Sequence, residues 1–369
     1  MFKESREKGI LPQDQRIATI VAIHKKGKPA DSCDGYRPIS LIGAEAKILA
    51  KILANRLLGV ISSLIHPDQS GFMPNRSTAL NLRRLHGVLS RVPYIGEPAA
   101  VLSLDAKMAF DIMEWGYMLE VLRKMGFGPN FVRWIQLLYT EPLAQVRVNG
   151  ATSQTFPLGR GTRQGCPLSP LIFALILEPL AVWIRQDHLI RGLNWNNTWE
   201  DRISLYADDI LLYLADPVGS IERVMHILYI FHQYSGFTIN WQKSILFLLK
   251  GPALRLSSRC PIAWSQTTFK YLGVYITRDP KEFYELNLLP PLIRLKSDIH
   301  HWSSLPLSLL GRAALFKMMS LPRFIYILQN DPFPVPHSYF YNNRKRATWA
   351  ALGGIYSPHS PRQADPQLV

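Results

Sequence analysis

The chain has few cysteines, and their placement excludes a fold held together by disulfides. Only three occur in 369 residues, at Cys33, Cys166 and Cys260, an odd number with wide spacings. Neither a disulfide framework nor the paired spacing of a zinc knuckle is present, so we expect a reducing compartment. The N-terminal residues MFKESREKGI contain no apolar stretch, so no signal peptide is expected.

Long apolar runs are absent as well. The most apolar stretch, Pro167 to Ile184, is interrupted by Pro170, Glu178 and Pro179. Because a membrane-spanning helix needs about 20 predominantly apolar residues, this stretch is expected in a protein core and no membrane partner is predicted. There is no repeat and no long low-complexity linker. With 47% hydrophobic and 19% charged residues, the composition is that of a globular protein.

Acidic residues are scarce relative to basic ones. The chain has 27 Asp and Glu against 42 Lys and Arg, a formal net charge of +15 that is spread over nearly its whole length. A distributed excess of this size indicates a polyanionic partner, nucleic acid before membrane. Charge alone leaves the question open, because many basic proteins bind no nucleic acid.

Hydrophobic patterning predicts an α+β fold, in which an antiparallel sheet is backed by helices and helical regions lie at both ends. Apolar residues at helical spacing predict helices, and β-branched and apolar runs bounded by turns predict strands. The predicted helices span 43–65, 112–125, 170–186, 221–234 and most of the chain after 284; the predicted strands span 99–104, 144–156 (a pair turning at Asn149-Gly150), 203–214 (a hairpin) and 269–277.

Carboxylates stand where apolar strands end or turn. Asp208 and Asp209 interrupt the apolar stretch ISLYADDILLYLAD, and Asp105 directly follows a buried strand. Strand ends of this kind can bring distant carboxylates to one sheet edge, where their repulsion favours a bound divalent cation such as Mg²⁺. The alternative is ordinary turn chemistry, since Asp favours turns, and the D-x-x-E spacing of Asp111 and Glu114 is typical of a helix cap.

Seven motifs in order give the chain a resemblance to the reverse transcriptase domain of LINE-class non-LTR retrotransposons. One such motif is weak, but seven at the family's rough spacing are specific, and the match extends to about Pro336. The motifs are YRPISLI (36–42), HPDQSGFMPNR (66–76), LSLDAKMAFD (102–111), GTRQGCPLSPLIFALILEPLA (161–181), YADD (206–209), GFTINWQKS (236–244) and YLGVYIT (271–277).

The resemblance implies a right-hand polymerase fold. It predicts fingers over 1–98, a palm over 99–280 with an inserted fingers segment near 140–165, a thumb over 281–345 and a loose tail over 346–369. It also implies two Mg²⁺ ions in the active site, with Mn²⁺ as a possible substitute. Asp105 and Asp208 would hold these ions with Asp209 beside them, and the carbonyl of Ala106 would be a further ligand.

Four residues are expected at the incoming nucleotide. Phe110 matches the aromatic residue that blocks a 2′-hydroxyl and so selects deoxynucleotides; its alternative role is core packing at a strand-to-helix corner. Gln164 and Gly165 match residues that line the nucleotide and template, and glycine lets the backbone come close to a substrate. Tyr206 opens the YADD motif beside them.

Basic residues are expected at the triphosphate. Arg37 matches the fingers residue that grips it, a role suited to a fork of donors. Lys26 is a second candidate, although Lys25 and Lys28 are equally available in the same segment and a solvated basic loop is the alternative. For Lys243 a proton-donor role toward pyrophosphate is conceivable, and an ordinary surface lysine is the simpler interpretation.

The primer end is expected at the hairpin containing Tyr271, Leu272 and Gly273, and basic residues after Tyr284 would contact the duplex as parts of the thumb. The predicted partners are therefore an RNA template, a DNA primer and dNTPs; nothing in the sequence indicates an oligomeric state. One departure is that Lys107 and Met108 stand where the family pattern A-E-K-A-F-D has other residues. Since the preceding endonuclease domain and the N-terminal extension of the polymerase are missing, we expect this chain to be a fragment.

The leading hypothesis is therefore an RNA-directed DNA polymerase core. A catalytically silent nucleic-acid-binding remnant of the same fold is the alternative, and the intact Asp105, Asp208, Asp209 and Phe110 argue against it. An RNA-dependent RNA polymerase is a third possibility, which Phe110 as a gate against ribonucleotides disfavours.

Overall fold

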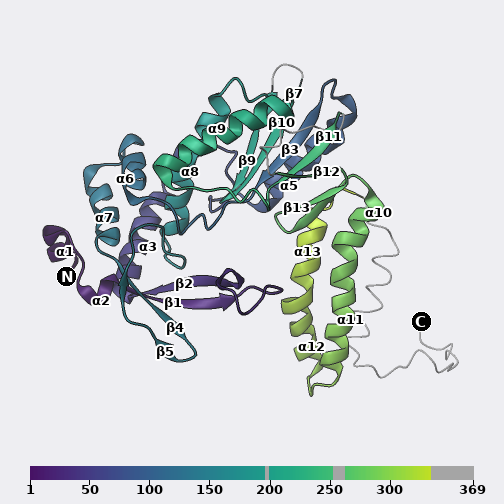
Figure 1. Cartoon of the computed structure of the whole chain (residues 1–369). Coiled ribbons are helices and arrows are strands. Elements are labelled where there is room, and N and C mark those ends of the chain that lie inside the picture. The colour runs from purple at the N-terminus through teal and green to yellow at the C-terminus, as the bar shows by residue number, and fades with distance from the viewer. Residues whose placement is uncertain (196–198, 252–261, 334–369) are drawn as a thin grey trace. The chain divides into compact units, whose positions relative to one another are not determined.

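The computed structural model describes residues 1–195, 199–251 and 262–333, which fall into two compact units (Figure 1). The first unit comprises residues 1–81 and 90–266, and the second comprises residues 82–89 and the chain from Thr267 onward. Helix α5 (Thr78–Arg91) therefore contributes its ends to the first unit and its middle to the second. Sheet and helix are mixed throughout, as the sequence predicts.

The central sheet of the first unit has the strand order β12-β11-β3-β10-β9. Strand β3 lies in its middle and pairs antiparallel with β10 on one side and with β11 on the other. Its sequence AAVLSL is buried except at Ser103, as expected of a strand whose two faces are both covered. The strands are β3 (Ala99–Leu104), β9 (Ile203–Tyr206), β10 (Asp209–Leu214), β11 (Ile245–Lys250) and β12 (Ala263–Ser265).

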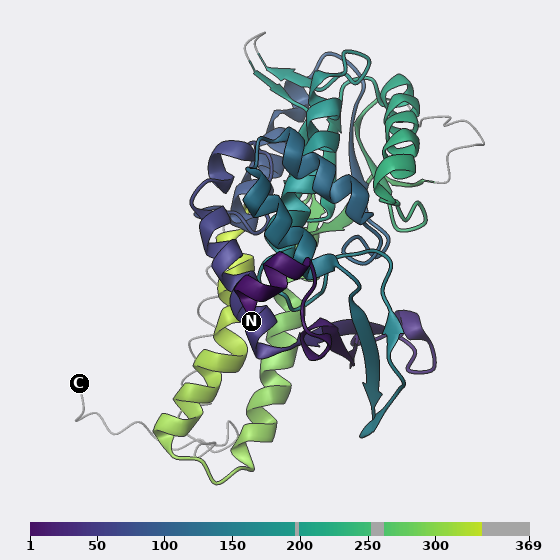
Figure 2. The same ribbon diagram turned by 90° about the vertical axis from the view of Figure 1, so that its left-hand side faces the viewer.

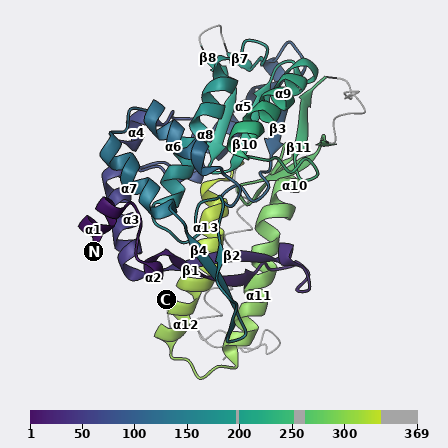
Figure 3. The same cartoon turned by 60° about the vertical axis from the view of Figure 1, so that its left-hand side comes forward.

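Helices α8 and α9 lie along this sheet (Figure 3). Almost all of α8 is buried, including Phe173 and Leu175, because a helix that is apolar on all sides must lie inside a protein or a membrane. Among the described residues it alone is long and apolar enough to cross a membrane, yet 67% of it is buried, which favours a core helix. The helices around the core are α3 (Ala44–Leu58), α4 (Ile61–Leu64), α6 (Trp115–Lys124), α7 (Pro129–Tyr139), α8 (Ser169–Gln186) and α9 (Pro217–Ser235).

A second sheet of the first unit, in the order β2-β1-β4-β5, forms a separate twisted layer (Figure 2). Strands β4 and β5 turn at Asn149-Gly150 as predicted, with both residues at positive φ, the conformation of a tight hairpin turn. The strands are β1 (Ile17–His24), β2 (Tyr36–Ile42), β4 (Leu143–Val148), β5 (Ala151–Thr152) and β6 (Phe156–Pro157), which pairs with β4; the chain also forms α1 (Phe2–Lys8), α2 (Gln13–Arg16) and a small hairpin of β7 (Leu193–Trp195) and β8 (Trp199–Asp201).

The second unit, in its described part, is a hairpin followed by helices. Strands β13 and β14 pair around the turn Leu272-Gly273, which confirms the hairpin that the resemblance implies; the single strand predicted over 269–277 from the apolar pattern is wrong. The hairpin packs on the helices that follow, and both belong to this unit. Its elements are β13 (Thr268–Tyr271), β14 (Val274–Thr277), α10 (Pro280–Phe283), α11 (Leu289–Ser303), α12 (Leu309–Leu315) and α13 (Leu321–Gln329), with wide helical turns at Tyr284–Leu288 and Phe316–Ser320. The predicted tail over 346–369 lies outside the described residues.

Candidate active site

The YADD motif forms the turn between β9 and β10. Tyr206 pairs with Asp209, so the turn consists of Ala207 and Asp208 alone. Ala207 has a φ of 55°, a left-handed conformation that residues other than glycine adopt only at a cost. Both strands beyond the turn are buried, which fixes the position of the turn at the end of the sheet.

Asp105 reaches the same end of the sheet from β3. The antiparallel register pairs Leu104 with Ile210, so the residue after Leu104 emerges beside the first residue of β10. The backbone of Asp105 is held from the other side, because its carbonyl accepts from the N–H of Asn240 (2.7 Å) and its N–H donates to Ser244 Oγ (3.2 Å). The topology thus brings Asp105 together with the adjacent pair Asp208 and Asp209, about a hundred positions further along the sequence.

The carboxylates disturb one another electrostatically. Burial, then the charges of Asp208 and Asp105, raise the pKa of Asp209 to about 7. Burial and the charge of Asp105 also raise the pKa of Asp208. Lys243 Nζ lies 3.9 Å from Asp105 Oδ2 but is 61% exposed, so this lysine offsets the cluster only weakly.

The three carboxylates are suitable ligands for a divalent metal ion that prefers oxygen. Their donor atoms are carboxylate oxygens that carry unneutralised charge, which Mg²⁺ prefers over nitrogen or sulfur. Within residues 1–195, 199–251 and 262–333, no cluster of three or more His, Cys, Asp or Glu side chains could hold a metal ion by itself. Because Mg²⁺ keeps several waters and takes other ligands from substrate phosphates, a complete protein cage is not required.

The backbone of Ala106 is oriented toward the same place. The ladder with residues 238–240 uses the carbonyl of Asp105 and the N–H of Lys107, which donates to Thr238. Peptide groups alternate along an extended chain, so the N–H and carbonyl of Ala106 point the other way, toward the side of β3 on which β10 lies. The role of this carbonyl as a metal ligand stays a prediction.

Phe110 lies between two other aromatic rings. It stacks on Phe173 of α8 with ring centroids 4.4 Å apart, and Phe72 meets it edge-on at 6.1 Å. Its side chain is half-buried. Core packing and a gate role are compatible here, because the ring is held rigidly on one side and remains accessible in part.

Gln164 and Gly165 are attached to β2. The carbonyl of Gln164 accepts from the N–H of Ser40 (2.7 Å), and a Cβ on Gly165 would lie 2.8 Å from the carbonyl oxygen of Ser40. Glycine is required at 165 by this contact and by its φ of 106°. Glycine at position 165 is therefore required by the packing of its loop on β2. The sequence predicts a different reason, a close approach to substrate.

Asp111 is not the helix cap predicted from its spacing. Its carboxylate accepts two hydrogen bonds from Gln164 Nε2 (3.0 and 3.2 Å), and α6 begins only at Trp115, with Glu114 as the preceding residue. The intervening chain is held to the loop before Gln164, since the N–H of Gly161 donates to the carbonyl of Met113 (2.8 Å). Burial raises the pKa of Asp111, while the Gln164 hydrogen bonds and the charge of Lys25 lower it.

The predicted triphosphate residues lie on β2 and on the loop between β1 and β2. Arg37 is exposed and pairs with Ile23 across the two strands. Lys26 is exposed in the loop, whereas Lys25 is half-buried and its charge acts on Asp111. Of the three lysines that the sequence leaves as alternatives, Lys25 is thus the one whose charge acts on Asp111, the residue bonded to Gln164.

The predicted primer hairpin belongs to the second unit. The carbonyl of Leu272, at the turn, accepts a hydrogen bond from Tyr326 of α13. Buried Asn287 holds the next strand, because its side chain both accepts from the N–H of Tyr275 (2.8 Å) and donates to its carbonyl (2.9 Å). Tyr271 is buried and Gly273 is exposed, so the hairpin presents its turn backbone on a rigid support.

Gln69 lies in the motif HPDQSGFMPNR, but the sequence predicts no role for this residue. In the structure this residue lies against Ala207 of the YADD turn. No local signal indicates such a contact, because the two residues are 138 positions apart.

A central sheet that is antiparallel from β11 through β3 and β10 to β9, with carboxylates at one end and helices packed against it, is typical of right-hand polymerases. The chain belongs to the reverse transcriptase (RNA-dependent DNA polymerase) family, whose sequence profile matches residues 23–276. This confirms the resemblance inferred from the seven motifs.

Similar proteins come from transposable elements. The chain is 34% identical over 284 residues to the transposon TX1 uncharacterized 149 kDa protein of Xenopus laevis, covering 76% of this chain and 21% of that protein. It is 25% identical to the retrovirus-related Pol polyprotein from the type-1 retrotransposable element R2 of Popillia japonica (88% and 45% covered). It is also 25% identical to the RNA-directed DNA polymerase from mobile element jockey of Drosophila melanogaster (89% and 36%). The chain thus spans less than half the length of each of these relatives.

Solved structures with a similar fold are telomerases. Apo telomerase from Candida tropicalis truncated from its C-terminal domain superposes with a TM-score of 0.51 at 13% identity, over 73% of this chain and 54% of that one. Telomerase from the same organism in complex with a TWJ fragment of telomeric RNA gives 0.51 at 12% identity, over 92% and 58%. At these identities the likeness concerns the fold alone.

Proposed function

We propose that this chain is the core of an RNA-directed DNA polymerase of a non-LTR retrotransposon, extending a primer 3′-hydroxyl with dNTPs on an RNA template. The observation that supports this best is the convergence of Asp105, Asp208 and Asp209 at one end of the central sheet. A polymerase needs concentrated negative charge at this point to hold cations between primer and triphosphate. Family membership supports the same reaction.

Asp105 and Asp208 would hold two Mg²⁺ ions, with the Ala106 carbonyl as a further ligand and Asp209 beside them. When bound, the ions would lower the pKa of the attacking 3′-hydroxyl and stabilise the negative charge on the leaving pyrophosphate. Asp209, the carboxylate with the most perturbed pKa, then serves to tune the charge of the cluster.

The remaining residues bind and orient the nucleotide. Arg37 donates a planar fork of hydrogen bonds to phosphate oxygens, and Lys25 or Lys26 adds positive charge from the neighbouring loop. The Phe110 ring excludes a 2′-hydroxyl because its stacking on Phe173 keeps it from moving aside. In the reaction the 3′-oxygen forms a bond to the α-phosphorus, the bond from that phosphorus to the bridging oxygen breaks, and pyrophosphate leaves.

The proposed nucleic-acid partners are an RNA template and a DNA primer. The net charge of +15 supports a polyanionic ligand. In the second unit, exposed Arg294, Lys296 and Lys317 lie on its helices, where they would contact backbone phosphates without reading sequence.

Primer extension on poly(rA) with an oligo(dT) primer, Mg²⁺ and labelled dTTP tests the proposal. The chain is expected to extend the primer, and Asp208→Ala to abolish extension while template–primer binding is retained. Asp14→Ala, which removes an exposed carboxylate of α2, is the matched control and should extend normally. Undiminished extension by Asp208→Ala would refute the assignment of the site. A wild-type chain that binds template–primer without extending it would indicate a silent remnant, and efficient rNTP incorporation an RNA polymerase.

A further inference from the structure

Residues 66–76 form a segment that runs beside β9, the strand leading into the YADD turn. The N–H of Ser70 donates to the carbonyl of Leu205, and the N–H of Leu205 donates to the carbonyl of Asp68, both at 2.8 Å. Gln69 and Leu205 form a parallel bridge. The segment therefore acts as a short additional edge strand on the outer side of the central sheet.

The side chain of Gln69 continues this pairing onto the turn itself. Its Oε1 accepts from the N–H of Ala207 (2.9 Å) and from the N–H of Gly71 (2.8 Å), and its Nε2 donates to the carbonyl of Ala207 (3.2 Å). Gln69 is 1% exposed, so water cannot replace these bonds. The amide thus holds both peptide groups of the residue that precedes Asp208.

The segment and the turn are in direct backbone contact. A Cβ on Gly71 would lie 2.1 Å from the backbone nitrogen of Ala207, so only glycine allows this approach. Ala207 itself is in the left-handed conformation, which costs about 1–2 kcal/mol for a residue with a side chain. Such a conformation persists only where surrounding contacts compensate for it, and the two bonds between Gln69 and Ala207 are such contacts.

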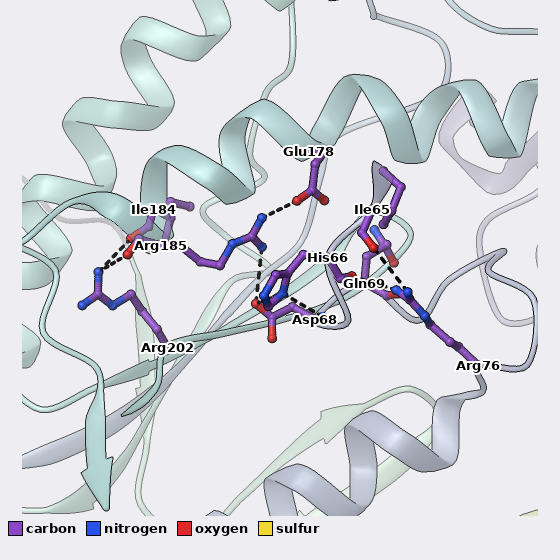
Figure 4. Close-up of polar contacts among 9 residues, drawn as sticks. All are labelled: Ile65, His66, Asp68, Gln69, Arg76, Glu178, Ile184, Arg185 and Arg202. Carbon is purple, nitrogen blue, oxygen red and sulfur yellow. Dashed lines mark hydrogen bonds and ion pairs between the residues drawn. The ribbon is translucent and has the colours of Figure 1, made fainter. Parts of the chain in front are cut away.

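Two arginines hold the segment in place: Arg76, its last residue, ties its own backbone together, and Arg185 anchors it to α8 (Figure 4). Arg76 Nη1 donates to the carbonyls of His66 and Gln69, each at 2.7 Å, and its Nη2 donates to that of Ile65 at 3.2 Å. Arg185 of α8 bonds the carboxylate of Asp68 at 3.3 Å and that of Glu178 as well. The backbone that carries Gln69 is therefore fixed on both sides of the residue.

We propose that Gln69 is a positioning residue for the catalytic turn: through Ala207 it sets the place of the Asp208 carboxylate. This rests on the proposed polymerase function, since it assigns Asp208 the metal-holding role. A carboxylate that must meet a metal and a substrate at fixed distances tolerates little displacement, and a turn of two residues cannot hold that position alone.

The test replaces Gln69 by Met, which has similar length and no amide. In primer extension with saturating dTTP, kcat for Gln69→Met is expected to fall by about tenfold to a hundredfold. The KM for template–primer is expected to stay within about threefold, because the turn does not bind the duplex. The Mg²⁺ concentration for half-maximal extension is expected to rise, which a general loss of stability would not cause.

Asn81→Ala is the matched control. Asn81 Nδ2 donates to the carbonyl of Leu205 at 2.9 Å and its Oδ1 accepts from Ser70 Oγ at 2.6 Å, so this variant removes buried hydrogen bonds to β9 and to the segment but none to Ala207. At equal folded fraction, Asn81→Ala is expected to keep the wild-type Mg²⁺ requirement and a kcat within about threefold of wild type. Equal losses of kcat in the two variants, or an unchanged Mg²⁺ requirement in Gln69→Met, would overturn the proposal.

Two further measurements separate this proposal from the proposed function, because neither needs turnover. Hydrogen exchange of peptides containing Ala207 is expected to accelerate in Gln69→Met and not in Asn81→Ala. Binding of Mn²⁺ alone, followed by electron paramagnetic resonance, is expected to weaken in Gln69→Met only. If the wild-type chain extends no primer, the polymerase proposal fails while these two measurements still decide the role of Gln69; unchanged exchange and Mn²⁺ binding would refute it.

Discussion

Replacing Asp209 by Asn should stabilise the metal-free protein, although the replaced residue lies in the proposed active site. The carboxylate of Asp209 is half-buried next to Asp208 and Asp105, and its pKa rises to about 7 because burial and these two charges disfavour its ionised form. Asn has nearly the same shape and never ionises. The variant therefore keeps the packing and removes one of three charges that repel one another.

The structure gives both the size and the pH dependence of the gain. A rise in pKa from 3.8 to about 7 corresponds to roughly 4 kcal/mol at about 1.36 kcal/mol per pKa unit. Since the side chain is only half-buried, water recovers part of this cost and about 2 kcal/mol is expected. The folded state retains a proton that the unfolded state has released between about pH 4 and 7, so wild-type stability falls as pH rises through this range. The gain in Asp209→Asn should thus be absent near pH 4 and complete above pH 7.

Urea unfolding in EDTA, followed by tryptophan fluorescence at pH 4.5 and pH 8, measures the effect. Asp14→Asn is the control, because it makes the same chemical change at an exposed carboxylate and should alter the unfolding free energy little at either pH. A gain of equal size at both pH values would mean that relief of charge is not its cause. A loss of stability at pH 8 would refute the inferred repulsion within the cluster.

Three other predictions concern binding and selectivity. Phe110→Val should lower the preference for dTTP over UTP by about tenfold or more, measured as the ratio of kcat/KM values, because a smaller side chain leaves room for a 2′-hydroxyl. Arg37→Lys should raise the KM for dTTP about tenfold with little change in template–primer affinity, since a lysine cannot bind two phosphate oxygens in a fork; an unchanged KM would remove Arg37 from the triphosphate site. Template–primer affinity, measured by fluorescence anisotropy, should fall by about tenfold or more between 50 and 200 mM salt. A salt-independent affinity would contradict binding of phosphates by the exposed lysines and arginines.

Much of the central sheet could be predicted from the sequence, because its signals are local. The run 99–104 and the hairpin arms on both sides of YADD are continuous apolar stretches between turn residues, and the structure has strands there. The hairpin turn at Asn149-Gly150 is predictable because both residues tolerate a positive φ, a property that depends on no distant contact. The three carboxylates could be singled out because charges at the ends of buried strands are costly.

Features that depend on distant contacts cannot be predicted from local patterns. The helix expected from Ile112 begins at Trp115, because backbone groups before it bond to distant residues: the carbonyl of Met113 accepts from Gly161, and the N–H of Glu114 donates to the carbonyl of Ser235. The strand expected over 269–277 is interrupted at Leu272, whose carbonyl is held by Tyr326 from a helix more than fifty residues away. Neither Gly161 nor Tyr326 contributes a signal to the local pattern that it overrides.

The end of the central sheet is destabilised by some residues of the site and stabilised by others. The two groups come from different parts of the sequence. Three carboxylates and a left-handed Ala207 all destabilise the end of the sheet in the absence of metal. The bonds of Gln69, whose own backbone is held by Arg76, resist the relaxation that this strain would otherwise drive. The turn then keeps its charges together before any cation arrives. A turn of two residues cannot hold these charges in place alone, so it needs bonds from another part of the chain. The buried side-chain amide of Gln69, 138 positions away, supplies them.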